Sequence, residues 1–391
     1  MRRLAALALF AATALAAGAS PPVDRAAYLL GYTDSICDDP RGQFYNWRTR
    51  RAMVVRADGT GRREVGAALL TRPDSWTGFA GWWPDGRAII GSAWEDEKNY
   101  LWEREHKTFR HTQGWLIDTC LVDLTTGATL NLTAIERVSD YNSGLRPWPG
   151  DPKRATFSAI LNGIQHPFVM EADGRNKRDL TSGPEGFTYA ASVSPDGRLI
   201  AYNKNYLVYV AEKDGSNPRR VDEIREHTFQ FVPTWSPDGR WLLFLAGQHY
   251  KCHPHLVRAD GSGLRKLADR GTYRSTMEPL KFPDFHSGHS DLPVWSADSQ
   301  WVYYTAQIGE AVELLRVSLA GKIEQLTHSP AGVAYYHPTV SPDGKLIAFG
   351  STRDGPGAQY VAHADGTDIR ALTTPTPGRV QLHAHWRPLA P

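Results

Sequence analysis

Histidines gather in the second half of the chain at spacings that suit a metal site. The sequence has 14 histidines. His286 and His289 lie close together, His337 follows, and His383 and His385 are separated by one residue. Neutral imidazoles with nearby carboxylates are ligands that Zn²⁺ and Mn²⁺ accept. We predict that these five histidines help to hold a divalent metal, Zn²⁺ or Mn²⁺. For each one taken alone, a surface or capping role remains the alternative.

A second group of possible ligands lies between residues 248 and 291. Cys252, His253 and His255 occur within four residues of each other, and Asp284 lies in the stretch that also carries His286 and His289. These four residues form an alternative metal set. The simpler interpretation of Cys252 is a small buried apolar residue, since cysteine is among the most often buried residue types.

Aromatic and polar residues suited to carbohydrate binding also lie outside regular patterns. Residues 102–111 form a charged aromatic stretch, for which a solvated helical turn is the alternative. Aromatic rings pack on sugar rings, while amide, imidazole and guanidinium groups hydrogen-bond hydroxyls and carboxylates. The predicted substrate-binding residues are Trp102, Tyr141, Asn205, His227 and Tyr250.

The elements that must position these residues are repeated hairpins. Apolar strands flank a Pro-Asp-Gly type of turn at residues 83–86, 194–197, 236–239, 296–299 and 341–344, with a degenerate copy at 148–152. Proline presets φ at the first turn position, and Asp-Gly tolerates the left-handed backbone that closes a tight turn. Asp-Gly-type turns alternate with them at residues 58, 126, 173, 214, 260, 320 and 365. Such periodic hairpins are typical of a propeller built from four-stranded blades.

Six turns of the first kind stand against seven of the second kind, so one hairpin is missing from the first series. The two ends of the chain supply it. His385-Trp386-Arg387-Pro388 resembles an inner strand whose next strand is residues 27–33. Pairing them closes the ring and removes exposed sheet edges. We therefore predict an all-β fold, a seven-bladed β-propeller of four-stranded blades, closed by the C-terminal strand in the N-terminal blade. Long connections on one face then bring the candidate site residues to the mouth of the central channel.

Composition and the N-terminus limit the setting of the protein. Arg2 and Arg3 precede an apolar run ending at Ala17, and Ala17-Gly18-Ala19 has the form of a cleavage site, so we predict a signal peptide over residues 1–19. Residues 20–391 form the propeller, which we expect to be exported, periplasmic or extracellular, without a membrane span and monomeric. A retained N-terminal anchor is the alternative.

A net charge of +2 in 391 residues argues against nucleic acid as a partner. Three cysteines allow one disulfide at most, and Cys37 with Cys120 is our guess.

The Ser-Pro-Asp-Gly and Asp-Gly repeats over residues 27–388 resemble those of TolB-type propellers, and the histidine-rich face resembles oligogalacturonate and ulvan lyases. The resemblance implies an exported polysaccharide lyase that cleaves a uronate-containing glycan by β-elimination. Gln381-Leu382-His383-Ala384-His385 is similar to the metal-binding cluster of the pectate-type enzymes, although its spacing departs by one residue. It adds Gln381 to the predicted metal ligands.

Such an elimination needs a group that neutralises the uronate carboxylate, a base and an acid. We nominate His106, His111, His166 and Tyr206 for the base and acid, and Arg110 or Arg274 as the neutralising cation. The expected partner is an acidic polysaccharide or oligosaccharide. The alternative is a non-catalytic TolB-like propeller that binds a glycan or envelope proteins, which leaves the convergence of histidines unexplained.

Overall fold

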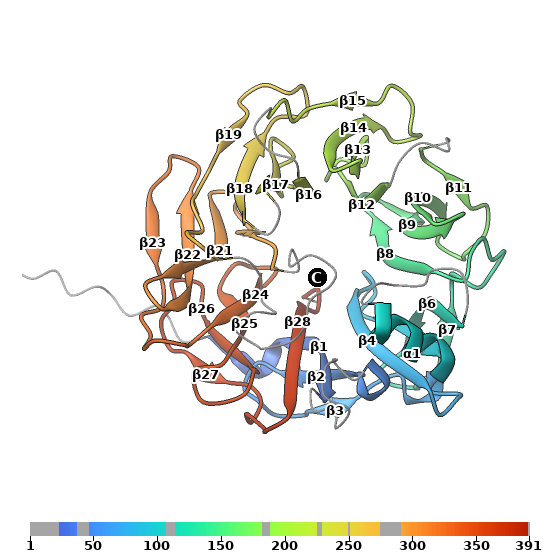
Figure 1. The fold of residues 1–391 in the computed structure, drawn as a ribbon, viewed down its shortest axis with the longest axis horizontal. Coiled ribbons are helices and arrows are strands. Elements are labelled where there is room, and N and C mark those ends of the chain that lie inside the picture. The colour runs from blue at the N-terminus through green and yellow to red at the C-terminus, as the bar shows by residue number, and fades with distance from the viewer. Residues whose placement is uncertain are drawn as a thin grey trace, which may run out of the picture.

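The computed structural model describes residues 23–36, 47–106, 114–181, 188–224, 229–248, 251–273 and 291–389. These residues form seven four-stranded antiparallel sheets arranged as the blades of a ring (Figure 1). The predicted seven-bladed propeller is confirmed. Blades are numbered here so that blade 1 contains the first strand of the chain.

The closing blade combines both ends of the chain, as predicted. Its order is β28, β1, β2, β3, and β28 pairs with β1 from Leu30 opposite Trp386 to Ile36 opposite Arg379. The strands of blade 1 are β28 (Arg379–Trp386), β1 (Leu29–Ile36), β2 (Arg51–Arg56) and β3 (Arg63–Glu64). The Asp34 carboxylate strengthens this closure, because it accepts hydrogen bonds from Arg379 on β28 at 3.0 Å and from Arg62 at 2.8 Å.

The other six blades follow one another along the chain, each with its first strand innermost. Blade 2 contains β4 (Ser75–Trp82), β5 (Ala88–Glu95), β6 (Trp115–Val122) and β7 (Thr129–Asn131). Blade 3 contains β8 (Asn142–Trp148), β9 (Asp151–Leu161), β10 (Ile164–Glu171) and β11 (Arg178–Asp179). Blade 4 contains β12 (Thr188–Val193), β13 (Leu199–Lys204), β14 (Leu207–Glu212) and β15 (Arg219–Arg220). Blade 5 contains β16 (Phe229–Trp235), β17 (Leu242–Gln248), β18 (Lys251–Val257) and β19 (Arg265–Lys266). Blade 6 contains β20 (Val294–Trp295), β21 (Trp301–Ile308), β22 (Ala311–Ser318) and β23 (Ile323–Gln325). Blade 7 contains β24 (Tyr335–Val340), β25 (Leu346–Ser351), β26 (Ala358–His363) and β27 (Arg370–Ala371).

The Ser-Pro-Asp-Gly repeats form the turns that the sequence predicts. At residues 194–197 the Ser194 hydroxyl donates to the Asp196 carboxylate at 2.6 Å and accepts from the backbone N–H of Leu199 at 2.9 Å. Gly197 has a φ of 70°, a left-handed conformation that glycine adopts without a Cβ clash. The same serine and aspartate bond recurs in three later blades, at residues 236–238, 296–298 and 341–343.

Tryptophans at the ends of inner strands tie neighbouring blades together. The indole N–H of Trp82 donates to the carbonyl of His385 at 2.9 Å, and that of Trp386 donates to the carbonyl of Thr339 at 3.0 Å. Trp235 reaches Ser192 in the preceding blade at 3.1 Å in the same way. Middle strands such as β25 are buried along their whole length, because the faces of adjacent blades pack on each other.

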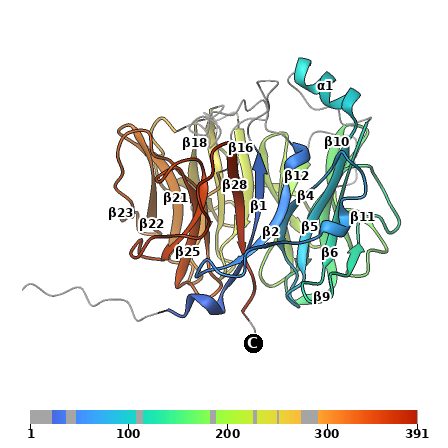
Figure 2. The ribbon, with the colours of Figure 1, turned by 90° about the horizontal axis from the view of Figure 1, so that it is seen from below.

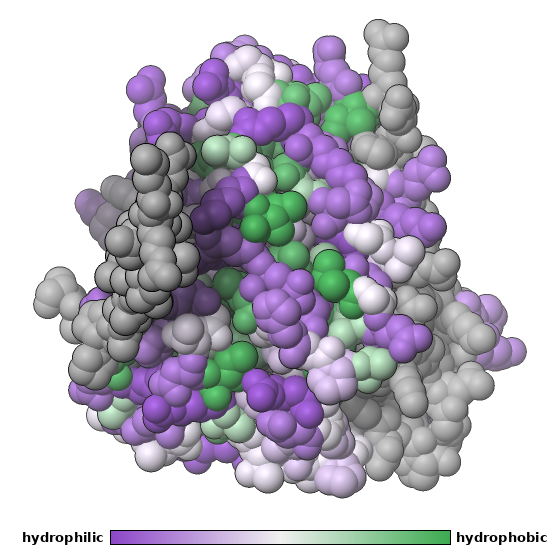
Figure 3. All heavy atoms as spheres, turned by 90° about the vertical axis from the view of Figure 1, so that its left-hand side faces the viewer, coloured by the Kyte–Doolittle hydropathy of each residue, from purple (hydrophilic) through white to green (hydrophobic). Residues whose placement is uncertain are grey.

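The two faces of the ring differ. The only α-helix among the described residues, α1 (Glu97–His106), stands between β5 and β6 on the face opposite the C-terminus (Figure 2). Three short 3₁₀ turns, η1 (Arg25–Ala27), η2 (Trp47–Thr49) and η3 (Ala67–Leu69), complete the described elements. The outer wall near β22 and β23 is mainly polar, and exposed apolar residues such as Ile323 are scattered (Figure 3).

Candidate functional site

Two inner strands carry a histidine at the same position of a β-bulge. The pairing of β24 with β25 shifts after Tyr336, and that of β28 with β1 shifts after Leu382. His337 and His383 occupy these bulges with φ values of 49° and 55°, in the left-handed region that non-glycine residues seldom adopt. Bulges often re-aim side chains next to functional sites. The imidazoles of these two residues, from adjacent blades 7 and 1, stack with ring centroids 4.1 Å apart.

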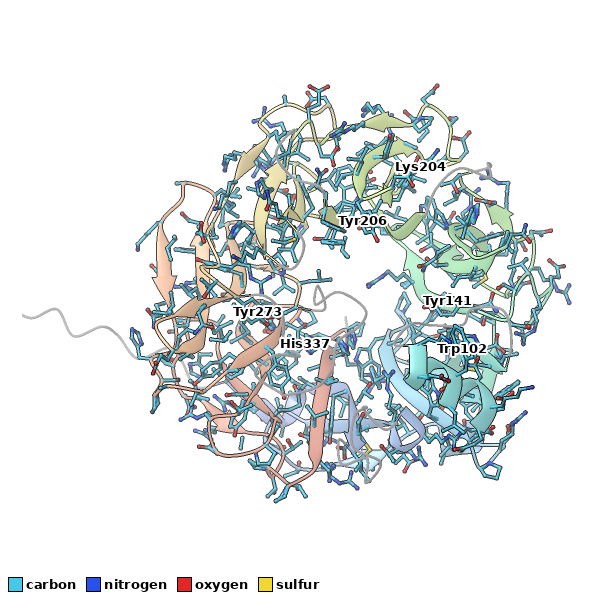
Figure 4. All side chains as sticks on the ribbon, viewed as in Figure 1. Trp102, Tyr141, Lys204, Tyr206, Tyr273 and His337 are labelled. Carbon is cyan, nitrogen blue, oxygen red and sulfur yellow. The ribbon has the colours of Figure 1, made fainter. Side chains whose placement is uncertain are left out.

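The backbone of His337 is anchored by a buried carboxylate from the neighbouring blade. The Asp291 carboxylate, 2% exposed, accepts from the His337 N–H at 2.8 Å and from the Tyr273 hydroxyl at 2.8 Å. The Thr305 hydroxyl and the Arg270 guanidinium complete its shell. Tyr273 and His337 lie on the same side of the channel in Figure 4. This network holds the His337 bulge in place.

Two histidines of β28 are kept neutral at neutral pH. Burial, followed by the charges of His383 and Arg146, lowers the pKa of His385 to about 3. Burial, followed by His337 and Arg50, lowers the pKa of His383 well below 6.5. The His385 ring also faces Phe79 of β4, with centroids 6.1 Å apart. Both imidazoles are therefore unprotonated, but a pKa this low makes them weak bases in the free protein. A bound anion beside them would favour the protonated form and raise these pKa values toward the range that a base requires.

An aromatic cleft adjoins these histidines on the blade 2 side. Its volume is about 310 Å³, and its lining includes Arg50, Trp76, Phe79, Trp115 and Tyr141. The Arg50 guanidinium lies over the Trp76 ring at 4.8 Å, and Trp115 meets Tyr141 edge to face at 5.3 Å. Burial raises the pKa of the Tyr141 phenol, so it stays protonated. Phe79 of the cleft contacts the His385 ring, and the charge of Arg50 contributes to the lowered pKa of His383.

Arg146 is a second cation in the channel. It lies on β8, the innermost strand of blade 3, just after the bulge at Gly144. Its charge lowers the pKa of His385 on β28. Because blade 2 separates blades 1 and 3, this interaction runs across the channel side of the ring. Arg50, Trp76, Trp115 and Arg146 were not among the sequence candidates, since none stands in a recognisable motif.

The other predicted residues are distributed as follows. Tyr141 lies in the cleft, and Tyr206 lies at the inner side of blade 4, 38% exposed, where its ring packs on Phe229 (Figure 4). Asn205 is exposed beside it.

Trp102 and His106 stack on each other within α1, with ring centroids 4.2 Å apart. His166 is buried in blade 3, where its Nδ1 lies 2.8 Å from the Asp179 carboxylate. The structure therefore does not bring His106 and His166 into the histidine cluster.

The side chain of Gln381 is already hydrogen-bonded to residues of blade 7. Its side-chain oxygen accepts from the Gln359 N–H at 3.2 Å and from the Thr373 hydroxyl. Gln381 pairs with Asp34, whereas His385 pairs with Gly31, so the bulge adds one residue between them. An added residue exchanges the faces of a strand. Gln381 and His385 therefore lie on opposite faces, despite their even spacing.

The alternative metal set is not assembled by its described members. Cys252 packs against Phe231 and Leu245, and burial raises the pKa of its thiol to about 12. His253 and His255 project from the other face of β18, because side chains alternate along a strand. His253 Nδ1 accepts from the backbone N–H of Arg270 at 3.1 Å, and His255 Nδ1 lies 2.8 Å from the carbonyl of His253.

The guess that Cys37 and Cys120 form a disulfide is wrong, because Cys120 is a free, buried thiol. Several predictions concern residues outside the described part of the chain, and they stay predictions. They are the signal peptide over residues 1–19, Arg110, His111, His227, Tyr250, Arg274, Asp284, His286 and His289.

The described residues do not form a metal centre on their own. Within the described ranges, no group of three or more His, Cys, Asp or Glu side chains is arranged to hold a metal ion. The rings of His337 and His383 lie within 21° of parallel. Their in-plane lone pairs therefore run side by side and do not meet at one point. A metal ligand set at this place would need His286, His289 or another residue outside the described ranges.

Comparisons with known proteins agree with the fold. No family model matches the chain. The uncharacterized protein Atu1656 of Agrobacterium fabrum is 24% identical over 184 residues, 46% of this chain and 54% of that protein, so the chain spans about half the length of this curated relative.

Two solved structures are similar to the chain at low identity. An oligogalacturonate lyase in complex with manganese superposes with a TM-score of 0.54 and 12% identity, covering 82% of this chain and 80% of its own. TolB from Acinetobacter baumannii gives a TM-score of 0.49 and 12% identity, covering 93% and 67%. The expected resemblance to these propellers is confirmed at the level of fold.

In the part of the chain that the structure describes, no helix is long and apolar enough to cross a membrane.

Proposed function

We propose that this protein is an exported polysaccharide lyase that cleaves a uronate-containing glycan by β-elimination on the channel face. The observation that carries the proposal is the meeting of neutral His383 and His385 with the aromatic cleft through Arg50 and Phe79. An aromatic-walled cleft beside cations and neutral bases suits an anionic sugar chain. The likeness to an oligogalacturonate lyase supports the same class.

The reaction requires one proton to leave the substrate and one to enter it. His385 or His383 takes the proton from the carbon that bears the carboxylate. The electron pair of that C–H bond forms a carbon–carbon double bond as the neighbouring C–O bond breaks. The Tyr141 phenol gives its proton to the departing oxygen, which suits a group that burial keeps protonated. A cation beside the carboxylate stabilises the developing negative charge.

The other predicted roles belong to the same proposal. Tyr206 and Asn205 would contact sugar units beyond the cleft, and Trp102 and His106 would do so from α1. A divalent metal, Zn²⁺ or Mn²⁺, remains a separate hypothesis whose ligands would include His286, His289 and His337. No step above passes through a metal. We further propose a periplasmic or extracellular, monomeric protein, which cell fractionation and light scattering would test.

A binding propeller without catalysis is the second candidate, since the same cleft and cations would also hold an acidic glycan without cleaving it. Incubation with pectate, ulvan and other uronate glycans separates the two. The lyase produces unsaturated sugar ends with ultraviolet absorbance, and alanine at His385 abolishes them. Binding without any unsaturated product would favour the second candidate.

A further inference from the structure

We infer that the turn Asn205-Tyr206 of blade 4 is a stacking site for a pyranose ring, so that the protein favours glycans long enough to cross the channel mouth. The inference deepens the proposed function and rests on it. Figure 4 shows Tyr206 across the channel from His337. A sugar that packs on Tyr206 therefore belongs to a part of the glycan remote from the bond that is cleaved.

The first argument is the backbone conformation of Tyr206. Lys204 pairs with Leu207, so Asn205 and Tyr206 form a two-residue hairpin turn between β13 and β14. Their φ values are 51° and 60°, and a type I′ turn requires such positive values at both central residues. These turns favour Asn-Gly, and a bulky residue at the second position is a costly outlier. Outliers of this kind cluster at active sites and ligand-binding sites.

The matching turn of blade 3 shows what the backbone alone selects. Leu161 pairs with Ile164, and the turn between them is Asn162-Gly163, with φ values of 51° and 79°. A Cβ on Gly163 would meet no atom within 4 Å, so the backbone conformation and not a lack of space accounts for the glycine. Blade 4 thus carries a tyrosine where the neighbouring blade carries the residue that suits this conformation.

The Tyr206 ring is held in place and is still accessible. It packs against Phe229 and Phe231 of β16, with ring centroids 4.7 Å and 5.8 Å away. The Tyr206 carbonyl accepts from the N–H of Gln230 at 3.0 Å, so the turn is fixed to blade 5. A ring that is fixed beforehand loses little freedom when a ligand binds. The C–H face of a pyranose packs on an aromatic face, and the exposed amide of Asn205 can hydrogen-bond its hydroxyls.

The surroundings of the turn favour a sugar of the same glycan as the occupant. The turn joins the second and third strands of its blade, as α1 does in blade 2, and the cleft reaches this face at Glu95 and Trp115 on either side of the α1 connection. Among the described residues of this face, the exposed large apolar side chains are Leu101, Tyr206 and Ile308, from blades 2, 4 and 6. Side chains scattered in this way do not form the contiguous patch that a protein partner needs.

The test is calorimetric titration of the full chain with size-defined galacturonate and glucuronate oligomers, from the dimer upward. All proteins carry His385→Ala, so that the proposed elimination does not consume the oligomers. We expect the affinity to rise with oligomer length. Tyr206→Gly should remove this rise, weakening the binding of long oligomers about tenfold while leaving that of dimers unchanged.

Two further variants separate the ring from other effects. Tyr206→Phe keeps the ring and should bind as the parent does, which distinguishes stacking from an acid or base role of the hydroxyl. Asn217→Gly is the matched control, because Asn217 is exposed, has a φ of 50° and lies in the connection between β14 and β15, on the opposite face. It should also bind as the parent does.

Folding of the variants is checked by thermal unfolding. Because glycine suits the turn, Tyr206→Gly should unfold at a higher temperature than Tyr206→Ala, which keeps the strained backbone. The reverse order would overturn the inference and leave the proposed function standing. The same holds if long oligomers bind Tyr206→Gly undiminished, if dimers lose as much affinity as long oligomers, or if Tyr206→Phe loses binding. Failure of the unmodified protein to bind or cleave any uronate oligomer would overturn both.

Discussion

The two neutral histidines of β28 make the folded state sensitive to acid, and His385 gives the sharper prediction. Its pKa is about 3 in the folded protein and 6.5 in the unfolded chain. Between these values the unfolded chain binds a proton that the folded protein does not, so the stability falls as the pH falls below about 6.5. Each pH unit is worth about 1.4 kcal/mol, so His385 removes about 2 kcal/mol at about pH 5.

The perturbation is His385→Gln, which leaves no titratable group at this position. Urea unfolding at about pH 7.5 and pH 5, with a chelator in every sample, gives the loss of stability on acidification. We expect the variant to lose about 2 kcal/mol less than the unmodified protein over this range. His383 contributes to both proteins and cancels in the difference.

His106→Gln is the control for this experiment, because His106 is exposed on α1. It should lose as much stability on acidification as the unmodified protein. An equal loss in His385→Gln and in the unmodified protein would refute the reasoning, since it would mean that His385 is not kept neutral by its surroundings in the channel.

Three further predictions test other parts of the structure. Asp34→Asn should cost about 1–3 kcal/mol in urea unfolding, because Asp34 closes the ring, whereas Glu64→Gln, which loses a 3.8 Å ion pair with Arg51 between two partly exposed side chains, should cost clearly less; equal costs would argue against the role of Asp34. Gly350→Ala should lower the melting temperature markedly, because the new Cβ would lie 2.0 Å from the Tyr336 ring, and an unchanged melting temperature would contradict this packing. Tyr141→Phe should reduce lyase turnover about a hundredfold with little change in glycan affinity, and full turnover would remove Tyr141 from the acid role.

The fold could be predicted from the sequence because its signals are local. Each Ser-Pro-Asp-Gly turn satisfies its own hydrogen bonds within five residues, as Ser194 and Asp196 illustrate. The closing strand was recognisable for the same reason, since Trp386 repeats the inner-strand tryptophan of other blades. The contact of His337 with His383 also follows from equal positions in adjacent blades.

The parts of the site that were missed depend on information that is not local. The place of Gln381 is decided by a bulge, which reverses the face of a strand without a clear trace in the sequence. Arg50 and Arg146 stand in no motif, and their importance comes from which blades face each other around the channel. Arg146 does precede Pro147 and Trp148, so alignment of the inner-strand ends offers one signal that would have found it.

The measurement that tests the central claim most directly is incubation of the purified full chain with size-defined uronate oligomers. The products are followed by ultraviolet absorbance and by mass. We predict an unsaturated uronate product that carries no added water, and its loss in His385→Ala. Intact oligomers, or products that have each gained one water, would contradict the claim that this channel face catalyses β-elimination.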